Sequence, residues 1–139
     1  MASKIQLTKE EMKKEIVQCG RDVAYFLKHY AYISSPVDGK LILFDTFDFQ
    51  DDLLQDFNNH RFNIINKSRQ LGISTIAAGY IAWMLMFHRQ KNILVLATKL
   101  ETASNLVKKV KIMVKGVPEW MKIAKIKTDN KHSFELDNG

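Results

Sequence analysis

Residues 66–75 read Asn-Lys-Ser-Arg-Gln-Leu-Gly-Ile-Ser-Thr, and the runs on either side of this stretch predict the fold of the chain. Residues 62–66 before it form a short, largely apolar run that is typical of a buried strand. The apolar run 76–87 after it is too long for a strand and indicates a helix. A strand, a tight loop and a helix in this order are the arrangement of a phosphate-binding loop, where backbone N–H groups and the positive end of the helix dipole face an anion. We therefore predict a phosphate site in this loop.

The loop matches the phosphate-binding pattern G-x-x-x-x-G-K-[ST] at two of its four fixed positions. Gly72 stands at the second glycine and Ser74 at the hydroxyl that binds Mg²⁺. Lys67 replaces the first glycine and Ile73 replaces the lysine, so the positive charge that phosphates require is expected from Lys67 and Arg69. The residues alone leave a second interpretation open, which is a strand–helix turn whose cations are merely solvated.

Length and composition bound the class of protein. The 139 residues suit one domain, and 46% hydrophobic with 10% aromatic residues is typical of a folded chain. The single cysteine, Cys19, excludes an intrachain disulfide and favours a reducing compartment. The histidines show no metal-ligand spacing. The longest apolar run, residues 76–87, is shorter than the about 20 residues of a membrane span, so we expect a buried helix and no membrane partner.

The net charge of +6 is unevenly distributed along the chain. Residues 45–56 hold five aspartates and no base, whereas residues 89–132 hold eleven lysines or arginines against three acids, a local net charge of +8. Such a segment favours contact with a polyanion, and an ordinary solvated basic surface is the alternative. A helix expected here carries Lys108, Lys109 and Lys111 away from its apolar face, and these lysines are candidate DNA contacts.

Local signals predict the remaining elements. Thr8 and Glu11 form a capping box that starts the first helix, and Asp48 is the expected N-cap of another. Helices are expected over about residues 9–18, 21–28 and 48–57, with a break or bend at Cys19 and Gly20, and a further helix is expected from a second capping box at 98–101 onward. A strand is expected over residues 41–44, and strands 123–128 and 133–136 are expected to form a hairpin.

Residues 92–97 form a continuous apolar run, which is typical of a parallel strand covered on both faces. Residues 62–97 are therefore predicted to form a βαβ unit with a right-handed crossover. We predict one α/β domain over residues 1–139, a P-loop NTPase-type parallel sheet with flanking helices. An N-terminal helical layer over residues 1–33 packs on a nucleotide-binding α/β part over residues 41–139.

Residues 67–75 resemble the altered Walker A loop of the large terminase subunits of tailed bacteriophages, especially those of the T-even-like group. In that family a basic residue early in the loop can replace or accompany the usual lysine. Phe49-Gln50 stands where the family carries an aromatic-glutamine adenine motif, although Gln50 by itself is typical of an exposed helical glutamine. Residues 117–121, Val-Pro-Glu-Trp-Met, are similar to the family's Leu-Pro-x-Trp stretch. The resemblance spans residues 30–139.

This resemblance implies an N-terminal portion of the ATPase domain of a DNA-packaging motor, which moves double-stranded DNA into a procapsid. It implies ATP and Mg²⁺ as ligands, with Phe49 and Gln50 at the adenine and Ser74 at the metal. The phosphates would be bound by Lys67, Ser68, Arg69, Gln70, Leu71, Gly72, Ile73, Ser74 and Thr75. It also implies a homo-oligomeric ring, a portal protein and a small terminase subunit as partners, a nuclease domain in the full-length protein, and the host cytoplasm as location.

The sequence identifies no catalytic carboxylate. ATP hydrolysis in this class needs an apolar strand that ends in Asp-Glu, the Walker B strand, and no run here ends in that way. In the family a segment similar to residues 133–139 precedes that strand, so we expect a domain truncated before Walker B and inactive alone. Two other functions remain open. A helicase-like translocase is disfavoured by Ile73, because helicases normally keep the lysine. A non-catalytic nucleic-acid-binding domain would use the basic segment, with the loop as scaffold only.

Overall fold

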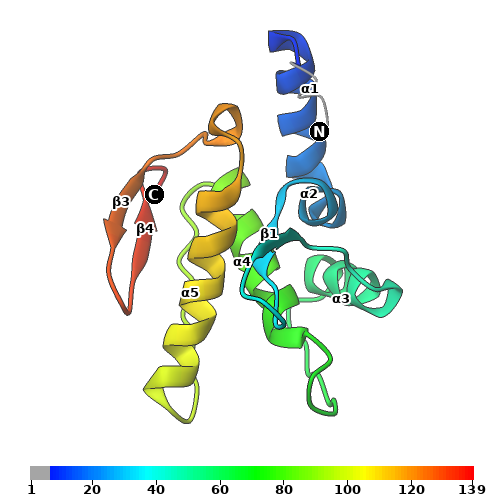
Figure 1. Ribbon diagram of the computed structural model, residues 1–139, viewed down its shortest axis with the longest axis vertical. Coiled ribbons are helices and arrows are strands. Elements are labelled where there is room, and N and C mark those ends of the chain that lie inside the picture. The colour runs from blue at the N-terminus through cyan, green and yellow to red at the C-terminus, as the bar shows by residue number, and fades with distance from the viewer. Residues whose placement is uncertain (1–6) are drawn as a thin grey trace.

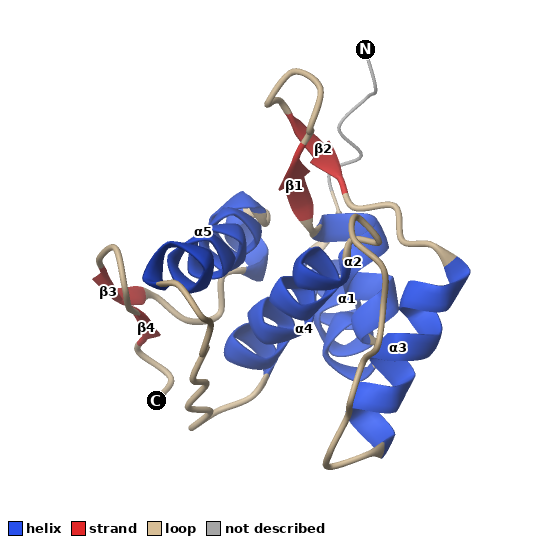
Figure 2. Ribbon diagram, turned by 90° about the horizontal axis from the view of Figure 1, so that it is seen from below, coloured by secondary structure: helices blue, strands red, loops and turns tan. Residues whose placement is uncertain are grey.

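The computed structural model describes residues 7–139 and is a mixed α/β arrangement (Figures 1 and 2). Helix α4 lies between α5 on one side and α1, α2 and α3 on the other (Figure 2). Within the described residues, the order of elements is α1 (Lys9–Arg21), α2 (Val23–Tyr30), β1 (Tyr32–Ser34), β2 (Leu41–Leu43), α3 (Asp48–Asn59), α4 (Ile73–Phe87), α5 (Leu100–Gly116), the 3₁₀ turn η1 (Glu119–Met121), β3 (Ile126–Asp129) and β4 (Phe134–Leu136).

Helices α1 and α2 begin at the caps that their sequences provide. Thr8 N donates to Glu11 Oε2 at 2.7 Å and Glu11 N donates to Thr8 Oγ1 at 3.3 Å, which confirms the first capping box. Helix α1 continues through the predicted break and ends at Arg21. Asp22 separates the two helices instead, because its Oδ1 accepts from Tyr25 N at 3.1 Å and so caps α2.

Two other predicted caps lie one residue away from the observed ones. Phe47, not Asp48, is the N-cap of α3, because Gln50 Oε1 accepts from Phe47 N at 3.1 Å and fixes the first turn there. The N-cap of α5 is Lys99, with no side-chain hydrogen bond, so the predicted capping box at residues 98–101 does not form.

The core is built around α4, which is apolar on nearly every side. Its buried residues are Ile76, Ala78, Gly79, Ala82, Trp83 and Met86. Trp83 Nε1 donates to Cys19 O at 2.7 Å and thereby ties α4 to α1. Cys19 is fully buried, and this burial raises the pKa of its thiol to about 12, so the thiol stays protonated and packs as a small apolar group.

Both sheets of the described residues are antiparallel hairpins. In the first, Tyr32 of β1 lies opposite Leu43 of β2. The second, β3–β4, confirms the predicted hairpin, and Asn130 Oδ1 accepts from Ser133 N at 2.8 Å in its turn. It lies alongside α5 (Figure 1), where Asp129 pairs with Lys111 at 2.8 Å.

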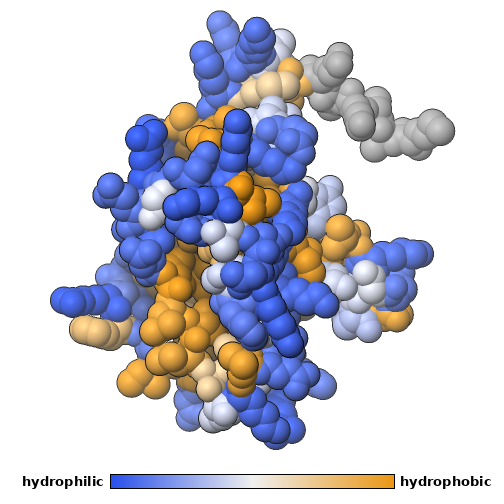
Figure 3. All heavy atoms as spheres, turned by 90° about the vertical axis from the view of Figure 1, so that its left-hand side faces the viewer, coloured by the Kyte–Doolittle hydropathy of each residue, from blue (hydrophilic) through white to orange (hydrophobic). Residues whose placement is uncertain are grey.

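The strands predicted over residues 62–66 and 92–97 do not form within residues 7–139. Several of their apolar side chains lie at the surface: Ile64 is 99% exposed, Leu94 80% and Leu96 83%. Ile93 and Val95 are half-buried. A strand takes its hydrogen bonds from a neighbour, and no described segment pairs with either run. The face that carries the β3–β4 hairpin shows an apolar band between polar surfaces (Figure 3). No helix of residues 7–139 has both the length and the hydrophobicity to cross a membrane.

The contact between α4 and α2 can be tested at Gly79, where a Cβ would lie 2.8 Å from Cδ2 of the fully buried Leu27. In Gly79→Ala the added methyl group would overpack the core against Leu27. The free energy of unfolding is expected to be about 1–3 kcal/mol lower than after a glycine-to-alanine change in a helix without such a clash. Gly20→Ala is the matched control, since its Cβ would lie 3.5 Å from Phe87 and the change gains about 1 kcal/mol of helix propensity. Urea unfolding measures both, and equal effects would contradict the close approach.

Candidate nucleotide-binding site

The predicted phosphate loop leads into α4 through two residues with left-handed backbone. Gln70 has φ 64° and Gly72, the N-cap of α4, has φ 70°. Gly72 O accepts from Thr75 N at 3.1 Å and from Ile76 N at 2.9 Å, which closes the first turn. No side chain caps this turn, so it presents backbone N–H groups and the positive end of the α4 dipole at the end of the loop. This is the geometry that binds anions.

Gln50 connects the start of α3 to this loop. Its side chain is only 2% exposed, and besides capping α3 it donates from Nε2 to Leu71 O at 3.1 Å. A Cβ on Gly72 would lie 2.7 Å from the same Nε2, so the loop passes directly over the amide. The two motifs that the resemblance assigns to one nucleotide are therefore in contact, although 21 residues separate the bonded pair.

A cavity of about 820 Å³ lies beside this junction. It is lined by the β1–β2 hairpin, the start of α3, the loop, and α4 and α5, and its residues include Phe47, Phe49, Gln50, Gln70, Gly72 and Lys109. The rings of Phe47 and Phe49 are nearly parallel, at 8°, with centroids 5.8 Å apart, and both are exposed. The volume is in the range of small-ligand sites, and exposed ring faces suit a planar base.

The positive charges predicted for the loop do not line this cavity. Lys67 and Arg69 are both exposed, and Lys67 Nζ donates to Ser68 O at 3.4 Å. Lys109 lines the cavity instead, because it reaches from α5 to donate to Thr75 Oγ1 at 3.0 Å. The sequence placed Lys109 among DNA contacts, and no local signal indicates its approach to α4.

The other candidate DNA contacts have different surroundings. Lys108 is exposed on α5. Lys111 and Lys115 both pair with Asp129 of the hairpin, and the hydrogen bonds from these lysines hold the pKa of the Asp129 carboxyl below its usual value. The three predicted lysines, Lys108, Lys109 and Lys111, thus face solvent, α4 and the hairpin respectively.

Few side chains near the cavity suit a metal ion. Among residues 7–139, no group of three or more histidines, cysteines, aspartates or glutamates is arranged to hold one. Asp51, from the acidic stretch, pairs with Lys28 at 2.5 Å and accepts from Thr46 Oγ1 at 2.6 Å, so it joins α3 to α2. The Ser74 hydroxyl is exposed on the first turn of α4, as a Mg²⁺ ligand from this loop would be.

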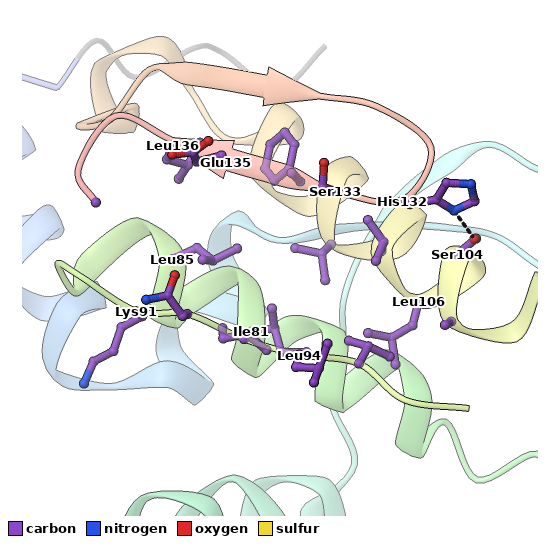
Figure 4. A pocket seen from close by; sticks show the side chains of 18 of the residues that line it. Ile81, Leu85, Lys91, Leu94, Ser104, Leu106, His132, Ser133, Glu135 and Leu136 are labelled. Carbon is purple, nitrogen blue, oxygen red and sulfur yellow. Dashed lines mark hydrogen bonds between the residues drawn. The ribbon is translucent and has the colours of Figure 1, made fainter. Parts of the chain in front are cut away.

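A second cavity of about 440 Å³ lies between α4, α5, residues 91–95 and the β3–β4 hairpin (Figure 4). Many of its lining side chains are aliphatic, among them Ile81, Leu85 and Leu106. At one end Ser104 Oγ and His132 Nδ1 lie 3.2 Å apart, at the surface. The first turn of α5, which also has no side-chain cap, borders this cavity. The predicted phosphate loop lines only the larger of the two cavities, which is therefore the more suitable one for phosphates.

No family model matches the chain.

The contact of Gly72 with Gln50 can be separated from backbone strain. Gly72→Ala puts a side chain on a left-handed residue, which costs about 1–2 kcal/mol, and also against the Gln50 amide. Gly39→Ala is the matched control, because Gly39 has the same φ of 70° and a Cβ there meets nothing within 4 Å. We expect Gly72→Ala to lower the free energy of unfolding by at least about 1 kcal/mol more than Gly39→Ala. Equal losses in chemical denaturation would mean that the Gln50 contact does not constrain the loop.

Proposed function

We propose that this chain is an ATP-binding portion of a DNA-packaging motor similar to the large terminase subunits of tailed bacteriophages. The observation that supports this most directly is the hydrogen bond from Gln50 to Leu71 beside the larger cavity. The resemblance assigns Gln50 to the adenine and the loop to the phosphates. Their contact allows one nucleotide to touch both.

In this proposal the base lies near Phe47, Phe49 and Gln50, and the phosphates lie at the first turn of α4. The amide of Gln50 has a second N–H and a second lone pair beyond those used for Leu71 and Phe47, so it keeps hydrogen-bonding capacity toward a base. The phosphates are stabilised by the backbone N–H groups after Gly72 and by the helix dipole.

Mg²⁺ would be held by the Ser74 hydroxyl together with phosphate oxygens, since this ion commonly uses few protein ligands. It would neutralise part of the phosphate charge. Hydrolysis would further need a carboxylate that orients water, and this is the part that we assign to a Walker B strand outside residues 7–139.

The same proposal explains why apolar side chains of residues 62–66 and 92–97 are exposed. We infer that they are strands of a P-loop parallel sheet that needs neighbours which residues 7–139 do not supply. In such a sheet, their connection through α4 would form a βαβ unit. The high exposure of Ile64, Leu94 and Leu96 supports this, because strands of such sheets are normally covered on both faces.

The DNA, the ring, the portal and the small subunit belong to the proposal through the resemblance. The basic segment supports a polyanion partner, with Lys108 as the exposed candidate of its helix. A non-catalytic nucleic-acid-binding domain remains the rival function, and a helicase-like translocase would also bind ATP here. Nucleotide binding separates the first rival from the proposal.

The test is stabilisation of the chain by Mg-ATP, followed as the unfolding midpoint at increasing ligand concentration. At a concentration of about 100 times the Kd of ATP, ATP is expected to stabilise the chain by about 2.7 kcal/mol. The same concentration of GTP is expected to stabilise it less, because the Gln50 amide can pair with the edge of adenine. Ser74→Ala is expected to weaken Mg-ATP binding about tenfold but to leave binding in EDTA unchanged, since it removes only a metal ligand.

Ser104→Ala is the control, because Ser104 lies in the wall of the second cavity. If Ser104→Ala rather than Ser74→Ala weakens binding, the nucleotide occupies the wrong cavity for our proposal. No stabilisation by any nucleotide would favour the non-catalytic function.

A further inference from the structure

Lys109 is a partly buried cation that forms no salt bridge with a carboxylate of residues 7–139. It lies on α5, and its Nζ donates to Thr75 Oγ1 at 3.0 Å. On the same helix Lys111 and Lys115 share the carboxylate of Asp129. Among residues 7–139, no salt bridge within 4.0 Å includes Lys109. The threonine hydroxyl accepts one of the three N–H groups of the ammonium, which leaves donors for a further acceptor.

The place of this ammonium favours a neighbouring anion. Thr75 belongs to the first turn of α4, so the positive charge of Lys109 lies at the positive end of the helix dipole. Anions are stabilised at that end of a helix and cations are not. An anion between the ammonium and the N–H groups of this turn would be attracted by both.

The loop itself places no positively charged side chain in the cavity wall to bind phosphates. Ile73 stands where the phosphate-binding pattern has lysine, and Lys67 and Arg69 are exposed and do not line the cavity. Lys109 does line it, together with Gln50, Gln70, Gly72 and Thr75. The packing of α5 on α4 therefore brings a cation to the side of the loop where the base and phosphates are proposed to lie.

We propose that Lys109 binds the phosphates of the nucleotide and takes the role of the lysine that Ile73 replaces. This inference rests on the proposed function, because it names a further binding residue in the same site. Thr75 is the positioning residue, since its hydroxyl holds the ammonium beside the loop.

A structural role makes a different prediction. If Lys109 only joined α5 to α4 through Thr75, its loss would affect every ligand of the cavity alike, or none. A phosphate-binding role affects only ligands that carry phosphates. The comparison of ATP with adenosine, which has the same base and ribose, therefore separates the two roles.

The experiment measures the affinities of the chain for ATP and for adenosine by calorimetric titration. Lys109→Met removes the charge and keeps an apolar stem of similar length. It is expected to weaken ATP binding about tenfold to a hundredfold, the effect of one hydrogen bond to a charged group, and to leave adenosine binding unchanged. Lys109→Arg keeps the charge and is expected to recover most of the ATP affinity.

Lys115→Met is the matched control on the same helix, because Lys115 lies away from the cavity and Asp129 keeps Lys111 as a partner. It is expected to bind ATP as the parent chain does. ATP affinity of Lys109→Met equal to the parent's, or equal losses for ATP and adenosine, would overturn the role of Lys109 and leave the proposed function standing. A parent chain that binds neither ligand would overturn the proposed function itself.

A second measurement uses the unaltered chain and so does not depend on the folding of a variant. An acyl-phosphate derivative of ATP transfers its acyl group to a lysine beside the terminal phosphate: the amine attacks the acyl carbon, an amide forms and ATP leaves. Mass spectrometry is expected to find the acyl group on Lys109, with labelling suppressed by excess ATP. Suppressible labelling of Lys67 without Lys109 would overturn the inference.

Discussion

The burial of α4 on opposite sides is the constraint on which the rest of the structure depends. A helix that is apolar nearly all round cannot leave a side in water, so it must be covered by separate layers. Helices α1 to α3 supply one cover and α5 supplies the other (Figure 2). As a consequence the N-terminal end of α4, with its loop, lies where segments from both layers can reach it.

The buried side-chain amide of Gln50 connects the packed helices to the phosphate loop. A polar group at 2% exposure must find hydrogen-bond partners, and Gln50 finds Phe47 on its own helix and Leu71 in the loop. The resulting approach leaves no space for a side chain at residue 72. Glycine is therefore required at residue 72 for two reasons: its backbone is left-handed, and a side chain there would clash with Gln50.

Some of the charges that are segregated along the sequence are paired with charges from distant segments. Asp51 of the acidic stretch pairs with Lys28, and Asp129 holds Lys111 and Lys115. The local excess of positive charge is thus not spread over one uniform surface. Lys109 differs from the other lysines of α5 because it faces α4. Its ammonium lies beside the positive end of the α4 dipole, and the two together would attract an anion.

Exposed apolar side chains show the limit of what a pattern can predict. The runs at 62–66 and 92–97 have the composition of covered strands, yet the described residues provide no strand beside them. Composition indicates that a segment prefers burial, because apolar surface is unfavourable in water. It does not provide the neighbour, and a strand without a neighbour has no ladder of hydrogen bonds.

The sequence by itself determined the elements whose interactions span a few residues. The capping box at Thr8 and Glu11, the length of α4 and the turn of the β3–β4 hairpin are all set by near neighbours. Only the tertiary structure decided which residues meet at the loop. Gln50 reaches Leu71 across 21 residues, and Lys109 reaches Thr75 across 34. Such meetings depend on how whole helices pack, because the orientation of one apolar face against another fixes where distant polar side chains fall.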